Sequence, residues 1–70
     1  MTRAEHLAWS KERALQYLPG DVEGATASFT SDLSKHDDLR SHAVLELIGM
    51  HALAGLLTES NCRSLIEGTN

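Results

Sequence analysis

Side chains that can bind a metal ion gather in one short segment of this chain. His36, Asp37 and Asp38 are consecutive, and His42 follows four residues later. Zinc sites built on a helix usually place two histidines four residues apart on one face. Here the two histidines are six apart and flank an expected junction, so the aspartates are better explained as caps of the following helix. We therefore expect neither a metal site nor a bound cofactor.

Nucleophilic catalysis is the second chemistry that these residue types could support. Cys62 is the single cysteine, which excludes an intramolecular disulfide, and a histidine could act as its base. Helical spacing places Cys62 on the inward face of a short helix, where a cysteine usually packs as a small hydrophobic side chain. The serines lack the strand–turn–helix context of a nucleophile elbow. The sequence therefore predicts that the protein is not an enzyme.

Binding chemistry is concentrated near the N-terminus. His6, Trp9, Arg13 and Tyr17 lie on one side of the expected first helix, and they include the only Trp and the only Tyr. Aromatic and Arg side chains are enriched at the centres of protein interfaces. This face therefore predicts a protein-binding site, for another protein or for a second copy of the chain. The alternative is that Trp9 and Tyr17 pack inside the protein, under the last helix and the C-terminus.

Charge and hydrophobicity exclude several kinds of partner. The chain has six basic and ten acidic residues and a net charge of −4. Binding to nucleic acid needs a concentrated basic surface, so we expect no direct nucleic-acid contact. The longest mostly apolar stretch, Ala43 to Leu57, contains Glu46 and His51 and is too short to span a membrane. Without an apolar leader segment, the expected location is the cytoplasm.

Two helices are expected in the first half of the chain. Thr2 and Glu5 form a capping box that starts the first helix, and Pro19-Gly20 ends it after Leu18. Asp21 is the expected N-cap of the second helix, which fades near His36. Gly24 in this second helix would either allow the first helix to approach closely or mark a mobile first turn.

The third expected helix runs from about residue 39 to 54, after a cap at Asp37 or Asp38. Its side chains are apolar around most of the circumference, and such a helix is usually buried. We therefore expect it to be the central element of the fold. Gly55 follows it and is well placed to end it in the left-handed conformation.

A short fourth helix is expected from Thr58 or Ser60 to Gly68, with Cys62 facing inward. No segment shows the β-branched alternation of a strand. The chain is too short for more than one domain, so residues 1–70 are expected to form a single unit. The predicted fold is all-α, a compact bundle of four short helices around the central third helix.

Three stretches carry a recognisable pattern: the opening MTRAEHLAWSKERALQYLPGD, the middle ASFTSDLSKHDD and the ending LIEGTN. They resemble a group of short proteins encoded by phages and prophages, mostly of actinobacteria. That group has no established activity and supplies no catalytic or ligand residues for this chain. The resemblance implies a setting, that of a small phage-encoded protein made inside a bacterial host cell.

Three functions are compatible with these observations. The leading prediction is a non-enzymatic phage accessory protein that binds a host protein, for host takeover or against a defence system. The alternative is a homo-oligomeric structural or virion-assembly protein whose aromatic face closes a symmetric interface. A weaker alternative is a helix-turn-helix-like transcriptional regulator, which the apolar third helix disfavours as a recognition helix.

Overall fold

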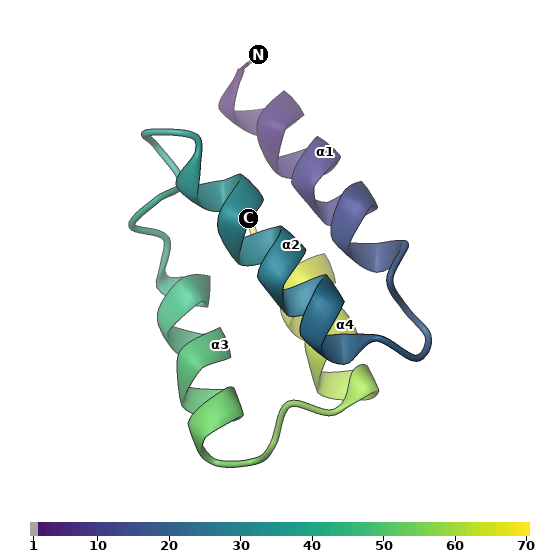
Figure 1. The fold of residues 1–70 in the computed structure, drawn as a ribbon. Helices are drawn as coiled ribbons and strands as arrows, with labels where there is room; N and C mark the ends of the chain where they lie inside the picture. Colours follow the sequence, from purple (N-terminus) through teal and green to yellow (C-terminus); the bar gives the residue numbers. More distant parts are fainter. Residues whose placement is uncertain (1) are drawn as a thin grey trace.

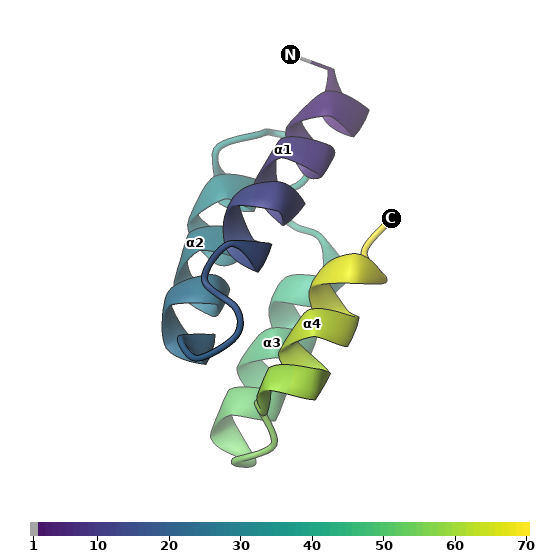
Figure 2. The same cartoon turned by 90° about the vertical axis from the view of Figure 1, so that its right-hand side faces the viewer.

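The computed structural model describes residues 2–70, and within them it contains four helices and no strand (Figure 1). The helices are α1 (Arg3–Leu15), α2 (Val22–Ser34), α3 (Ala43–Leu53) and α4 (Glu59–Glu67). The antiparallel helices α1 and α2 form one layer, and the antiparallel helices α3 and α4 form the other (Figure 2). The predicted all-α fold is therefore confirmed.

The limits of α1 follow from its end residues. The Thr2 hydroxyl accepts a hydrogen bond from the Glu5 N–H at 3.1 Å, and the Glu5 carboxylate accepts one from the Thr2 N–H at 3.0 Å. This is the predicted capping box. The helix ends at Leu15 rather than at Leu18. Proline disfavours helical geometry in the residue before it, which here is Leu18. Gly20, with φ of +109°, then reverses the chain.

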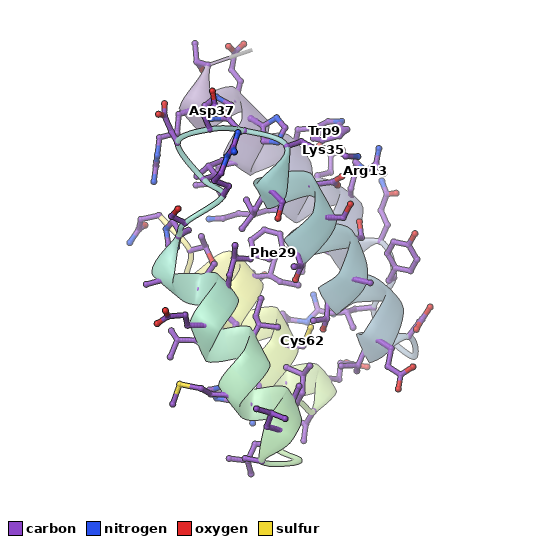
Figure 3. All side chains as sticks on the ribbon, turned by 60° about the vertical axis from the view of Figure 1, so that its left-hand side comes forward. Trp9, Arg13, Phe29, Lys35, Asp37 and Cys62 are labelled. Atoms are coloured by element: carbon purple, nitrogen blue, oxygen red, sulfur yellow. The ribbon has the colours of Figure 1, made fainter. Side chains whose placement is uncertain are left out.

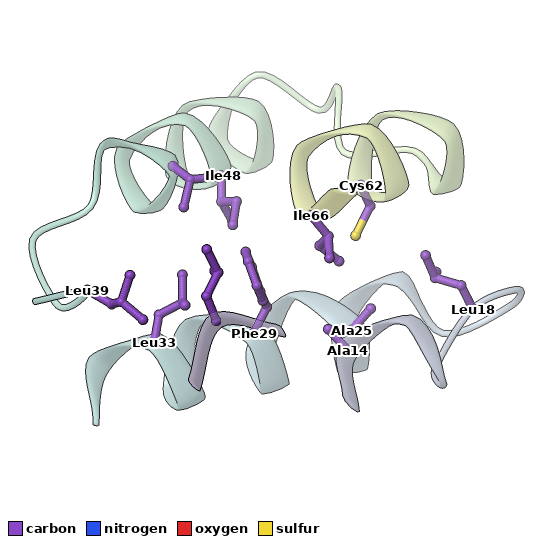
Figure 4. Close-up of a cluster of buried hydrophobic side chains, with 11 residues drawn as sticks. Ala14, Leu18, Ala25, Phe29, Leu33, Leu39, Ile48, Cys62 and Ile66 are labelled. Atoms are coloured by element: carbon purple, nitrogen blue, oxygen red, sulfur yellow. The ribbon is translucent and has the colours of Figure 1, made fainter. Parts of the chain in front are cut away.

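The hydrophobic core lies between the two layers, and Phe29 of α2 stands near its centre (Figure 4). Phe29 has no exposed surface, and the other side chains of the core come from all four helices, from the turn between α1 and α2 and from the turn between α2 and α3. These buried hydrophobic neighbours are Leu7, Ala14, Leu18, Ala25, Leu33, Leu39, Val44, Ile48, Cys62 and Ile66.

The expectation that the third helix is central is not confirmed. Only Val44 and Ile48 of α3 are buried, whereas α2 buries four side chains. In α3, the Leu53 side chain is 92% exposed. An apolar circumference favours burial, but a small domain has too few other elements to cover every side of a helix. The most buried helix is α2, and α3 lies at the edge.

The predicted cap of the third helix, at Asp37 or Asp38, is wrong. Residues 36–41 form turns, and Leu39 inserts its side chain into the core with no exposed surface. Because Leu39 is held there, α3 cannot begin until His42, whose Nδ1 accepts a hydrogen bond from the Val44 N–H at 3.0 Å. The imidazole is therefore the N-cap of α3.

The end of α3 follows the predicted pattern. Gly55 has φ of +72°, and its N–H donates to the Ala52 carbonyl oxygen at 3.2 Å. The N–H of Leu56 donates to the His51 carbonyl oxygen at 2.8 Å, which completes a Schellman motif. Of the two candidate caps for α4, Thr58 is the N-cap, and its hydroxyl accepts from the Asn61 N–H.

Candidate binding surfaces

The predicted binding residues of α1 face α2. Trp9, Arg13 and Lys35 gather on one side of the α1–α2 layer (Figure 3). The Arg13 guanidinium carbon lies 4.5 Å from the centroid of the Trp9 ring, a cation–π contact. Arg13 Nε also lies 3.0 Å from Oδ2 of Asp32, an ion pair without the alignment of a hydrogen bond.

His6 belongs to the same cluster. Its Nε2 lies 2.6 Å from the Asp32 carbonyl oxygen, so Nε2 carries the proton and donates it. The His6 ring lies 5.3 Å from the Trp9 ring and 5.2 Å from the His36 ring, measured between centroids. His6, Trp9 and Arg13 are therefore brought together, and all three are engaged with α2 or with one another.

Helix α4 contacts a different side of α1. Lys11 Nζ donates to the carbonyl oxygen of Glu67 at 3.2 Å, and the Arg3 guanidinium donates to that of Asn70 at 2.9 Å. Cations at these carbonyls also suit the negative end of the α4 dipole. Trp9 contacts His6 and Arg13 of its own helix, and Tyr17 lies beside Gly24 of α2. The contacts of α1 with the last helix and the C-terminus described here are made by Arg3 and Lys11 instead.

Tyr17 lies apart from the cluster, in the turn after α1. A Cβ on Gly24 would stand only 2.7 Å from Tyr17 Cδ1, so the absence of a side chain at Gly24 permits the predicted close approach. The Tyr17 side chain is 44% exposed. With Arg13 and Gln16 it lines an open depression of about 410 Å³. Of the predicted binding residues, Tyr17 therefore offers the most accessible aromatic ring.

A second surface, which the sequence did not single out as a binding site, lies on α3. Leu47, Met50, Leu53 and Leu56 are 44%, 63%, 92% and 55% exposed. We refer to these four side chains as the α3 face. The only sequence signal for it was the apolar circumference of the helix, which predicted burial rather than exposure. Which side of α3 is uncovered depends on how the two layers meet.

Open grooves border α3. One groove, of about 240 Å³, lies between α3 and α4 and includes Val44, Leu47 and Leu65 in its lining. The other groove, of about 390 Å³, includes Glu23 of α2 and Ala52 of α3 in its lining. Leu47 of the α3 face thus borders the first groove, and Gly55 and Leu57, the chain neighbours of Leu56, border the second.

Of the residues considered for catalysis and metal binding, Cys62, Asp37 and His42 make contacts within the fold. Cys62 is buried as predicted, and its Sγ lies 3.6 Å from the Thr26 hydroxyl. Asp37 pairs with Arg40, and His42 Nε2 donates to the Asn70 carbonyl oxygen at 2.8 Å. Within residues 2–70, no three His, Cys, Asp or Glu side chains are grouped so that they could hold a metal ion.

None of the helices in residues 2–70 combines the length and the hydrophobicity that a membrane crossing requires. Comparisons with protein-family models, with curated proteins and with solved structures give no match to this chain.

Proposed function

We propose that this chain is a non-enzymatic phage accessory protein that acts inside a bacterial cell by binding another protein, in host takeover or against a defence system. The phage setting is supported by the resemblance of its opening, middle and ending stretches to short phage and prophage proteins. The binding role is supported by one observation above all, the exposed α3 face.

The α3 face leaves a large apolar area exposed to water. Leu53 is almost fully exposed, and Leu47, Met50 and Leu56 each expose about half of their surface. Scattered apolar residues are common on surfaces, but here three large ones recur every three residues along α3 and Leu56 follows directly after the helix, and such a grouping is typical of an interaction site. Burying such side chains against a partner releases free energy in proportion to the area removed from water. A flexible Met at the centre can adapt to the partner's shape.

The aromatic residues of α1 offer a second candidate surface for the same function. The depression lined by Arg13, Gln16 and Tyr17 is open, and Tyr17 can contact a partner without disturbing the core. Trp9 and Arg13 are already engaged with each other, and Arg13 also with Asp32 of α2, so less of their binding capacity is free. The α3 face is therefore the stronger candidate.

Self-association is the alternative function, because an exposed apolar face can also close a symmetric dimer. The helix-turn-helix alternative has weaker support. No Lys or Arg occurs between Arg40 and Arg63, so α3 has neither of the side chains that most often contact phosphates and bases.

Site-specific photo-crosslinking tests the proposal. A benzophenone amino acid is placed at Leu53, at Tyr17 or at the exposed α2 residue Ala27, and the chain is expressed in actinobacterial cells. We expect one discrete adduct with a cellular protein from position 53 and none from position 27. The crosslinked protein is then purified, and its affinity is measured for the wild type and for Leu53→Ser.

Each outcome has a defined meaning. An adduct from position 53 whose purified partner binds wild type more tightly than Leu53→Ser supports the α3 face. An adduct from position 17 alone assigns the function to the α1 surface instead. An adduct with twice the mass of the chain supports the homo-oligomer. The binding role is refuted if all three positions give the same products.

A further inference from the structure

The α3 face has the dimensions of a docking site for one helix. Eleven residues of helix are about 16 Å long, or three turns. Leu47, Met50 and Leu53 are spaced three residues apart and form a ridge along the exposed side. One groove includes Leu47 of this ridge in its lining, and the other lies at the C-terminal end of α3. A ridge with adjacent depressions is the surface into which the side chains of a second helix interdigitate.

Gly49 leaves the α3 backbone uncovered next to Met50. Glycine in the interior of a helix lowers the stability of that helix by about 1 kcal/mol relative to alanine. Gly49 has no positive φ, and a Cβ built on it would meet nothing within 4 Å. No packing contact within residues 2–70 therefore requires glycine at this position. The bare backbone at Gly49 leaves room for an occupant to lie close to α3.

The charges around the α3 face are negative. Glu46 is exposed one helical turn before Met50, on the same side of α3. Glu23 lines the groove at the α2 end, beside Ala52. No Lys or Arg occurs between Arg40 and Arg63, and the whole chain carries a net charge of −4. An occupant with positive charges beside its apolar side chains is therefore attracted, and an acidic occupant is repelled.

A second copy of the chain fits this surface poorly. Two α3 faces would bring the same carboxylates together, from two molecules that each carry a charge of −4. Neither α3 face has a Lys or Arg with which to pair the other's Glu46. Electrostatic complementarity therefore favours a different chain as the occupant.

We propose that the α3 face receives an amphipathic helix of another protein, one whose apolar side chains are flanked by Lys or Arg. This inference rests on the proposed function and specifies the chemistry of the partner. The apolar ridge supplies affinity, and Glu46 and Glu23 select the charge of the flanking positions.

Two synthetic amphipathic peptides test this inference on the full chain. They share one leucine stripe and differ only in the flanking residues, which are Lys in one peptide and Glu in the other. Binding of each dye-labelled peptide is followed by fluorescence anisotropy. We expect the Lys peptide to bind at least about tenfold more tightly than the Glu peptide, with a preference that weakens as salt is added.

Neutral variants separate the apolar and the charged contributions. Met50→Ser/Leu53→Ser should weaken binding of the Lys peptide by at least about tenfold, because the double substitution removes the apolar ridge without changing the charge. Its matched control, Ala8→Ser/Ala27→Ser, alters exposed residues of α1 and α2 and should bind like wild type. Glu23→Gln/Glu46→Gln should reduce the preference for the Lys peptide, whereas Glu12→Gln on α1 should leave it unchanged. Circular dichroism confirms that each variant is folded.

The results distinguish this inference from the proposed function. If both peptides bind equally and both lose binding in Met50→Ser/Leu53→Ser, the face binds helices without charge selection and only the inference fails. If light scattering shows a dimer that this double variant converts to monomers, a second copy is the occupant and the inference is overturned. If neither peptide binds, the inference is refuted, and the crosslinking at position 53 decides the proposed function separately.

Discussion

At the scale of single residues, the contact between α1 and α2 depends on Asp32. Its side chain is 2% exposed, and Oδ1 lies 3.4 Å from Lys35 Nζ while Oδ2 lies 3.0 Å from Arg13 Nε. A buried carboxylate is costly unless cations or hydrogen bonds compensate it. Arg13 is thus needed to stabilise the fold, whether or not it also contacts a partner.

Arg13→Ala is expected to lower the free energy of unfolding by about 1–3 kcal/mol, the range for leaving a buried polar group without its partner. Lys35 remains beside Asp32 and limits the loss. Urea denaturation measures the change. Arg40→Ala is the matched control, because the Arg40–Asp37 pair is exposed, and such pairs contribute about 0–1 kcal/mol. Equal losses in the two variants would contradict the role assigned to Asp32.

Glu5 gives the fold a defined pH dependence. The Thr2 backbone N–H, followed by the Thr2 hydroxyl, holds the pKa of the Glu5 carboxyl below its ordinary value of 4.5. A lowered folded-state pKa contributes stability above the unfolded value, and that contribution is lost as the pH falls through the folded value. The capping box therefore stabilises α1 fully near neutral pH and weakens in acid.

Glu5→Gln should accordingly be less stable than wild type at pH 7. The difference in unfolding free energy should shrink as the pH falls below 4.5. Thermal unfolding at a series of pH values measures it, and Glu12→Gln, exposed on the same helix, is the control for the loss of one charge. A difference that stays constant or grows in acid would show that the charge of Glu5 does not stabilise the cap.

At the scale of elements, the start of α3 shows how a buried side chain displaces a helix. Asp37 and Asp38 have the residue type of an N-cap, but Leu39 is inserted in the core and the segment turns around it. His42 then caps the helix through Nδ1. Since Nδ1 accepts, the neutral ring carries its proton on Nε2, which donates to the Asn70 carbonyl oxygen. One imidazole thus joins α3 to the residues after α4.

His42→Ala should lower the free energy of unfolding by about 0.5–2 kcal/mol, the usual effect of losing an N-cap. His42→Asn should restore part of this loss, because asparagine is a good N-cap but replaces the imidazole that bonds to Asn70. Chemical denaturation measures both variants. Asp38→Ala, at a residue that the sequence proposed as the cap, should be close to wild type. The assignment of the cap fails if Asp38→Ala is the more destabilised.

At the scale of the whole molecule, two helical layers enclose one small core and leave α3 at its edge. Leu39 in a turn is fully buried, whereas Leu53 in a helix is 92% exposed. A 70-residue chain buries a smaller fraction of its surface than a larger domain does, so some apolar side chains remain uncovered. In this protein they collect on the α3 face, which is why the binding proposal is made there.

Leu39→Ala and Leu53→Ala compare the two environments with the same chemical change. Leu39→Ala should lower the free energy of unfolding by about 2–5 kcal/mol, because it leaves a cavity in the core. Leu53→Ala should change the unfolding free energy by less than about 0.5 kcal/mol, since the side chain has little contact to lose. Urea denaturation of both variants measures the difference. A large loss for Leu53→Ala would mean that α3 is covered in solution, by a second copy or by other residues.

Local signals predicted most of the helix ends. The capping box of Thr2 and Glu5, the turn at Gly20, the cap at Asp21 and the Gly55 terminus all depend on residues within a few positions of one another. Such short-range hydrogen bonds and backbone preferences are encoded wherever the residues occur. These helix ends could therefore be predicted without knowledge of the tertiary packing.

The binding surfaces were less predictable from the same sequence. The helical spacing of Trp9 and Arg13 correctly placed them on one side of α1, but not against α2 and the buried Asp32. The apolar circumference of α3 likewise predicted a central helix, whereas α3 lies at the edge of the fold. Periodicity shows which residues share a face, and it does not show which neighbouring element covers that face.

The sequence by itself determined the all-α class, the four helices and most of their ends, because these depend on local spacing, caps and glycine geometry. Only the tertiary structure decided that α2 rather than α3 is the most buried helix, that His42 rather than an aspartate caps α3, and that the apolar side chains of α3 face outward. The physical reason is that burial is set by competition among all the apolar faces for one small core. Phe29 and Leu39 occupy that core, and Leu53 remains outside it.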